Sequence, residues 1–127
     1  MNILQIYKEL LQISKNYFND VVSSGTVLFT ESQEPHKLRL KIVDGSIVDI
    51  FYSKIGKYSY HWERSLIDGT IFRHDNAPHK SWRKIKTYPK HFHFSSQNNV
   101  IESEINNDPL LAIKEFLSFI KETLALK

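Results

Sequence analysis

The sequence predicts an α+β fold, an antiparallel β-meander of five to six strands flanked by an N-terminal and a C-terminal helix. At both ends of the chain, apolar residues recur every three or four positions, which is the spacing of an amphipathic helix. Between the ends, apolar and polar residues alternate, which is the spacing of a half-exposed strand. Short turns separate these stretches, and short turns join antiparallel strands. The 127 residues are predicted to form one domain, residues 1–127.

The two predicted helices each carry one apolar stripe. The first covers about residues 3–19, and its stripe comprises Ile3, Ile6, Tyr7, Leu10, Ile13 and Tyr17. The stripe of the second comprises Leu110, Ile113, Leu117, Ile120 and Leu124. Asp108 and Pro109 favour a helix start, since the carboxylate can accept a backbone N–H and proline has none to satisfy. We expect the helices to bury one face of the sheet, with a core that includes Ile6, Leu10, Ile42, Ile50, Leu117 and Ile120.

The first three strands are predicted over residues 21–30, 37–42 and 46–52. Asp44-Gly45 separates the second from the third and is a dipeptide favoured in tight hairpins.

A second hairpin is predicted from residues 57–64 and 70–75, with Asp68-Gly69 as its turn. If the turn has two residues, Ile67 faces Thr70, and Arg64 pairs with Arg73. That register puts on one face Tyr58, Tyr60, Trp62, Arg73 and Asp75, and on the other His61, Phe72 and His74. A turn one residue longer reverses one strand. The last strand is predicted over residues 84–94 and is interrupted by Pro89, which cannot donate a backbone hydrogen bond.

The composition excludes several classes of function. Cysteine is absent, which removes disulfides, thiolate metal sites and thiol nucleophiles. No stretch approaches the roughly 18 apolar residues that span a bilayer, and the N-terminus lacks the pattern of a signal peptide. We therefore expect a soluble cytoplasmic protein without a membrane partner.

The segment from residue 74 to residue 93 concentrates the polar chemistry. Five of the six histidines lie between residues 61 and 93, and residues 76–101 contain no acidic side chain. The stretch carries more positive charge than the whole chain's net charge of +3. Its cations are Lys80, Arg83, Lys84, Lys86 and Lys90. Trp82 and Tyr88 lie among them, and cations with aromatic rings favour contact with a nucleic acid over a merely solvated basic face.

His91 and His93 fall on the same side of an extended strand. They can simply face water while Phe92 and Phe94 are buried, and the preceding Asp75–His79 segment can simply be a turn. Neither explanation accounts for the nearby Arg73 and His79. We therefore expect Asp75, His79, His91 and His93 to converge in one pocket.

Three segments resemble the TumE-type toxin family: Tyr58-Ser59-Tyr60-His61-Trp62, Arg73-His74-Asp75-Asn76-Ala77-Pro78-His79 and Thr87-Tyr88-Pro89-Lys90-His91-Phe92-His93. The resemblance covers roughly residues 35–95. Three positions depart from the family pattern. His74 stands where the family usually has tryptophan, and Lys80 and Lys90 stand where it often has histidine. The resemblance implies a toxin of a type II toxin–antitoxin pair with a helix-turn-helix antitoxin as partner. It assigns function to Tyr60, Arg73, Asp75, Asn76, His79, His91 and His93.

One hypothesis is a metal-independent endoribonuclease that needs no cofactor. RNA supplies its own nucleophile, the 2′-OH, so the protein needs a base, an acid and a cation. His91 or His93 would be the base and His79 the acid, while Arg73 would stabilise the charge of the transition state.

The remaining residues would position these groups and the RNA. Asp75 would orient an imidazole or Arg73, and Tyr60 would contact a phosphate or a base. Asn76 belongs to the binding set by resemblance. The alternative hypothesis is a metal-binding domain, using histidines and Asp75 as ligands for zinc or manganese, or a non-catalytic partner-binding domain. The oligomeric state is not indicated by the sequence.

Overall fold

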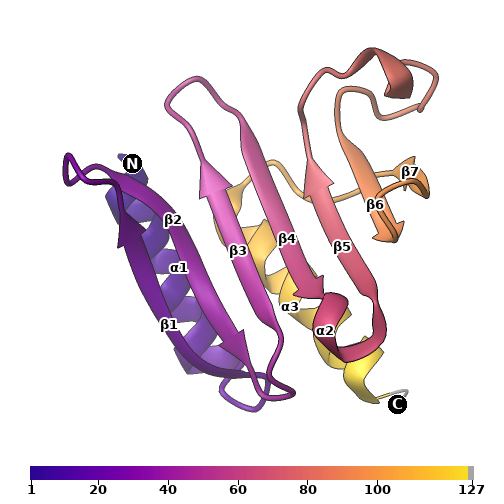
Figure 1. Ribbon diagram of the computed structural model, residues 1–127. Helices are drawn as coiled ribbons and strands as arrows, with labels where there is room; N and C mark the ends of the chain where they lie inside the picture. Colours follow the sequence, from indigo (N-terminus) through magenta and orange to yellow (C-terminus); the bar gives the residue numbers. More distant parts are fainter. Residues whose placement is uncertain (126–127) are drawn as a thin grey trace.

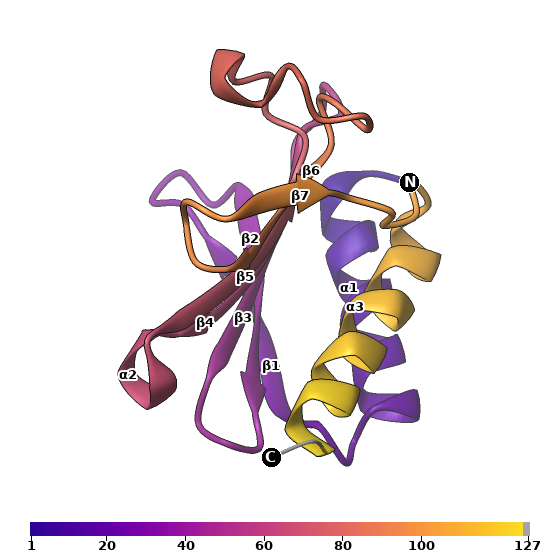
Figure 2. The same cartoon turned by 90° about the vertical axis from the view of Figure 1, so that its right-hand side faces the viewer.

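A computed structural model describes residues 1–125 of the chain. One seven-stranded antiparallel sheet has its strands in sequence order, β1 to β7. Both long helices cover the same face, and the other face is open (Figures 1 and 2). The elements are α1 (Ile3–Tyr17), β1 (Val22–Phe29), β2 (Pro35–Ile42), β3 (Ile47–Tyr52), β4 (Tyr58–Arg64), α2 (Ser65–Asp68), β5 (Thr70–Asp75), the 3₁₀ turn η1 (Lys80–Trp82), β6 (His91–Ser95), β7 (Val100–Glu102) and α3 (Pro109–Ala125). The predicted class and meander are confirmed, with more strands than the five to six expected.

Both helices begin at side-chain caps. The Asn2 carboxamide accepts the backbone N–H of Gln5 at 2.8 Å, and the Gln5 side chain accepts the backbone N–H of Asn2 at 3.1 Å. Asp108 accepts the N–H of Leu110 at 2.9 Å, which confirms the predicted start of the second helix. Within the described residues, no helix is long and apolar enough to cross a bilayer.

The core lies between the helices and the sheet. Five of the six residues predicted to be core are buried: Leu10, Ile42, Ile50, Leu117 and Ile120. Ile6 is partly buried and packs against them. Its neighbour Tyr7 is fully buried and turns its hydroxyl to the backbone of Tyr52.

The register predicted for the second hairpin is wrong. The turn is the short helix α2 followed by Gly69, so Thr70 pairs with Arg64 rather than with Ile67. This shift of three residues is odd, and an odd shift moves side chains to the opposite face. Phe72 and His74 therefore join Tyr58, Tyr60 and Trp62 on the helix-covered face, whereas Arg73 and Asp75 join His61 on the open face.

The last predicted strand is also wrong in its extent. Residues 84–90 are not a strand but part of the connection from β5 to β6, and the extended segment begins at His91. The side-chain oxygen of Thr87 holds this connection by accepting the N–H of Ser103 at 3.0 Å. The chain then reverses after Ser95 and adds β7, a strand that the sequence did not predict.

Candidate functional site

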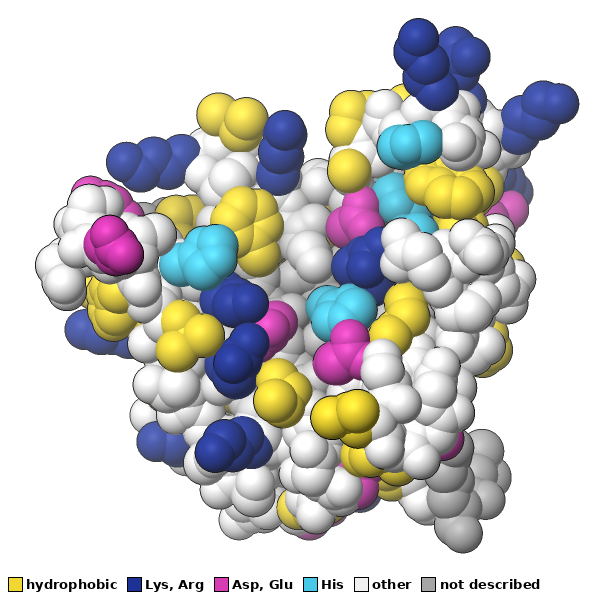
Figure 3. All heavy atoms as spheres, in the orientation of Figure 1, with side chains coloured by type: hydrophobic (Ala, Val, Ile, Leu, Met, Phe, Trp, Pro, Cys, Tyr) yellow, Lys and Arg dark blue, Asp and Glu magenta, His cyan; other side chains and the backbone are white. Residues whose placement is uncertain are grey.

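The candidate site lies on the open face of the sheet, at the ends of β5 and β6. Asp75 pairs with His91, and Arg73 pairs with His93. Side chains of directly paired residues project to the same face, so the register alone brings all four together. Histidine, acidic and basic side chains meet at this part of the open face (Figure 3).

Asp75 is the centre of the cluster. Its Oδ1 lies 3.1 Å from Nε2 of His91, and its Oδ2 lies 3.8 Å from Nε2 of His93. The Nε of Arg73 donates to Oδ2 at 3.1 Å, and the backbone N–H of Ala77 donates to Oδ1 at 3.0 Å. The carboxylate is thus held on several sides, and both imidazoles face it.

The backbone fixes the orientation of both imidazoles. Nδ1 of His91 lies 2.8 Å from the carbonyl oxygen of Pro89, and Nδ1 of His93 lies 2.8 Å from that of Gln97. Because a carbonyl oxygen only accepts, each Nδ1 must carry the proton. The neutral form of each ring therefore presents the lone pair of Nε2 to Asp75. These three residues form a group able to hold a metal ion, with ligand atoms within 4.8 Å of one another.

A tryptophan covers the two histidines. The Trp82 ring centroid lies 6.1 Å from that of His91 and 5.9 Å from that of His93, and both histidines are only 2% exposed. Burial lowers the pKa of His93 more than its bond to the Gln97 carbonyl raises it. The charge of Arg73 lowers this pKa further, which favours the neutral ring.

His79 stands apart from the pair. Its ring centroid lies 5.9 Å from that of Trp82, and its Nδ1 accepts the backbone N–H of Ser81 at 3.1 Å. The expected convergence holds for Asp75, His91 and His93. His79 is on the same side of the sheet but is exposed, with Trp82 packed against both it and the buried pair.

Two adjoining hollows give access to Arg73 from the open face. One, of about 500 Å³, is lined by His36, Lys37, Asp49, Phe51, Ser59, His61 and Arg73. The other, of about 240 Å³, is lined by Phe51, Lys57, Tyr58, Ser59, Arg73, Asp75, Asn76 and Ala77. His61 pairs with Arg73 across the strands and was not among the expected site residues. The correct hairpin register would have identified it.

The basic connection flanks the site. Lys80, Arg83, Lys84 and Lys86 are exposed. Lys90 is different, because its ammonium group donates to the backbone carbonyl of Ile105. Four of the five expected cations can thus contact a phosphate, whereas the ammonium group of Lys90 is hydrogen-bonded within the protein.

Two further residues expected to contact a ligand, Tyr60 and Asn76, instead make hydrogen bonds within the protein. Tyr60 is fully buried on the helix-covered face, and its hydroxyl bonds to that of Tyr52 at 2.5 Å. The Asn76 carboxamide accepts the N–H of Tyr58 at 3.0 Å and donates to the Gly56 carbonyl at 2.9 Å. The alternation placed Tyr60 on the wrong face, and Asn76 instead ties two loops together.

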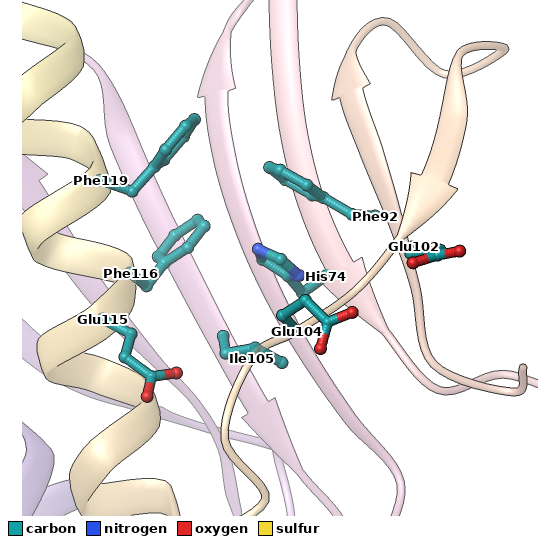
Figure 4. A pocket seen from close by; sticks show the side chains of 8 residues that line it. All are labelled: His74, Phe92, Glu102, Glu104, Ile105, Glu115, Phe116 and Phe119. Carbon is teal, nitrogen blue, oxygen red and sulfur yellow. The ribbon is translucent and has the colours of Figure 1, made fainter. Parts of the chain in front are cut away.

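A separate hollow of about 300 Å³ lies on the helix side of the sheet. In it, His74 stacks on Phe92 with ring centroids 3.8 Å apart and meets the edge of Phe116 (Figure 4). Burial lowers the pKa of His74 to about 3. Nδ1 of this ring lies 2.7 Å from the Ser103 hydroxyl. His74 is therefore a neutral, partly buried residue and belongs to a different face from the Asp75 cluster.

A family model described as Toxin TumE matches residues 9–124. The match includes the whole Asp75 cluster and the basic connection. No curated protein and no solved structure gives a significant match.

Proposed function

The chain belongs to the TumE toxin family, and on that premise we propose that it is the RNA-cleaving toxin of a type II toxin–antitoxin pair. The observation that carries the proposal is the position of the Asp75 cluster. Acid–base side chains and a guanidinium meet on an open sheet face, and Trp82, which covers the two histidines, belongs to the connection that carries four exposed cations.

The charge and shape of this face favour RNA as the target. Exposed lysines and arginines attract phosphates, and aromatic rings beside them stack on unpaired bases. Phe51 lies at the wall of both hollows, next to Arg73. A strand of RNA held by the basic connection would place a phosphate at Arg73 and a base near Phe51.

The reaction we propose is attack of a ribose 2′-OH on the adjacent phosphorus. The O–H bond of the 2′-OH breaks and its proton goes to a base, while the bond from phosphorus to the 5′-oxygen breaks and that oxygen takes a proton from an acid. Histidine suits both roles, because its unperturbed pKa of about 6.5 lies near neutrality. Arg73 would stabilise the charge that develops on the phosphoryl oxygens.

The geometry supports some of these roles better than others. Asp75 contacts both Arg73 and His91, as an orienting carboxylate should. The Nε2 atoms of His91 and His93 point to Asp75 beneath Trp82, so a base role for either requires the Trp82 ring to move aside. His79 is exposed and can deliver a proton from the outer side of that ring.

A helix-turn-helix antitoxin is the partner we propose. Type II antitoxins are proteins that bind the toxin directly, and a basic face is a natural target for an acidic segment. Co-expression with the product of the neighbouring gene, followed by copurification, tests this part. Binding that survives neutralisation of Lys84 and Lys86 would place the interface elsewhere.

The central test is cleavage of purified cellular RNA by the purified protein, with and without EDTA. The wild type should cut RNA, and Arg73→Ala should lose at least about 100-fold in rate, the scale of one transition-state contact. Lys8→Ala, on the exposed side of α1, is the matched control and should cut like the wild type. An Arg73→Ala protein that cuts as fast as Lys8→Ala would place the chemistry elsewhere.

A second candidate function is that of a metal-dependent enzyme or metal-binding domain. It is favoured by one observation, the presentation of two Nε2 atoms to one carboxylate. A cleavage reaction abolished by EDTA would support this alternative.

A further inference from the structure

We propose that Asp75, His91 and His93 bind one divalent transition-metal ion through a carboxylate oxygen and the two Nε2 atoms. Among the described residues this is the one group of three such side chains with its ligand atoms close enough together. The binding follows from geometry and does not rest on the proposed function, and an ion bound here would occupy both Nε2 atoms, so His91 or His93 could act as the base only in the metal-free protein.

The first argument is the direction of the lone pairs. Both Nδ1 atoms donate to backbone carbonyls, of Pro89 and Gln97. In their neutral forms both rings then turn a lone pair towards a carboxylate, which has only lone pairs of its own. Three acceptors that face one another repel unless a proton or a metal ion lies between them, and a single metal ion satisfies all three at once.

The second argument is the support behind each ligand. Histidines that bind metals almost always donate their other N–H to a carbonyl, a carboxylate or water, and carboxylate ligands are themselves hydrogen-bonded. Both histidines here meet that description. Asp75 meets it too, because it accepts from Arg73 and from the backbone of Ala77.

The distances are compatible with one shared ion. Two ligands about 2.0–2.1 Å from a tetrahedral metal lie about 3.4 Å from each other. Nε2 of His91 lies 3.1 Å from Oδ1 of Asp75, and Nε2 of His93 lies 3.8 Å from the other carboxylate oxygen, Oδ2, so the two separations lie on either side of that value. All ligand atoms fall within 4.8 Å of one another, so small side-chain rotations would bring them into the first coordination shell.

The donor set selects the class of ion. Mg²⁺ and Ca²⁺ prefer oxygen ligands throughout, whereas imidazole favours zinc and its transition-metal neighbours. Two imidazoles with one carboxylate occur in zinc enzymes and in ferrous sites. Three protein ligands also leave a coordination position free, as catalytic metal sites do and closed structural sites do not.

Titration of the metal-free protein with Zn²⁺ by calorimetry tests the proposal. One equivalent should bind, and Asp75→Asn and His93→Gln should each weaken the affinity by at least about 10-fold, the lower end for loss of even a supporting contact. His36→Gln is the matched control, since it removes an exposed histidine from the same open face without touching the cluster, and it should bind like the wild type. Mg²⁺ at the same concentration should give no binding.

A second measurement avoids dependence on the variants folding. In the wild-type protein, Mn²⁺ should broaden the imidazole NMR signals of His91 and His93 first and far more strongly than those of His36. Broadening that begins elsewhere, or undiminished Zn²⁺ binding by folded Asp75→Asn, would overturn the site.

The two proposals fail separately. A protein that cuts RNA in EDTA and binds no Zn²⁺ retains the proposed function and loses the metal. A protein that binds one Zn²⁺ through these residues but cuts no RNA, with or without metal, retains the metal site and loses the proposed function.

Discussion

Replacing His74 by phenylalanine should make the protein less sensitive to acid. His74 is stacked on Phe92 at 3.8 Å, with the ring planes only 7° apart. A phenyl ring has a similar flat shape and can occupy the same place. It cannot be protonated, so the substitution removes a titrating group and keeps most of the packing.

The size of the effect follows from the pKa of His74. Burial lowers that pKa from 6.5 to about 3. Between these two values the unfolded chain binds a proton that the folded chain does not, so the free energy of unfolding falls as the pH falls. Each pH unit in that window costs about 1.4 kcal/mol. From pH 6.5 to pH 5 the loss from His74 is therefore about 2 kcal/mol.

Urea unfolding at pH 7 and at pH 5 measures this effect. The wild type should lose about 2 kcal/mol more than His74→Phe does over that interval. At pH 7 the variant should carry a constant penalty of about 1–3 kcal/mol, because the buried Ser103 hydroxyl loses its partner on the ring. That penalty does not depend on pH and leaves the comparison intact.

The comparison between the two proteins isolates His74 from other titrating groups. The pKa of His93 is also lowered, and its contribution is present in both proteins. Equal losses of stability in the wild type and in His74→Phe would refute the reasoning, since they would mean that His74 is already protonated or solvated when folded.

Three further predictions concern the core, the site and the basic connection. Leu117→Ala, at a fully buried position of α3, should lower the free energy of unfolding by about 2–5 kcal/mol in chemical denaturation, and a loss below 1 kcal/mol would argue against the core described. Expression of the wild type should arrest growth, and His91→Ala or His93→Ala should relieve the arrest, because a positioned acid or base contributes roughly 10²–10⁴-fold in rate. Circular dichroism should still report a folded protein for both variants. Full toxicity of both variants would eliminate the acid–base roles assigned to His91 and His93. Lys84→Gln with Lys86→Gln should weaken RNA binding and reduce the slope of log affinity against log salt by about 1–2, since each phosphate contact to a single strand contributes about 0.7, and an unchanged slope would exclude the basic connection as the RNA contact.

The sequence by itself determined the local elements. The period of the apolar residues located both long helices, and alternation located the strands from β1 to β5. Asp108 identified the start of α3, because a cap depends on neighbouring residues alone. The spacing of His91 and His93 also placed them on one side of a strand, since strand geometry has a period of two.

The sequence also identified most of the cluster. Asp75, His91, His93 and Arg73 were expected to act together, and they do lie together. Strand order favours this outcome, because β5 and β6 are consecutive and consecutive strands tend to be neighbours.

Only the tertiary structure decided which face each strand presents. A period of two makes the faces of a strand equivalent until helices cover one of them, and the register depends on the length of the turn. The α2 turn set that register, so Trp62 and Phe72 stack under Phe119 of α3. The same register buries Tyr60 and places Arg73 on the open face.

The tertiary structure also decided the surroundings of the cluster. The placement of Trp82 over His91 and His93 comes from a fifteen-residue connection, residues 76–90, that has no repeating pattern to read. The carbonyls of Pro89 and Gln97 that orient the two rings belong to this connection and to the β6–β7 turn. Backbone groups carry no residue identity, so no sequence pattern encodes where their carbonyls point, and the direction of both Nε2 atoms follows from the folded chain alone.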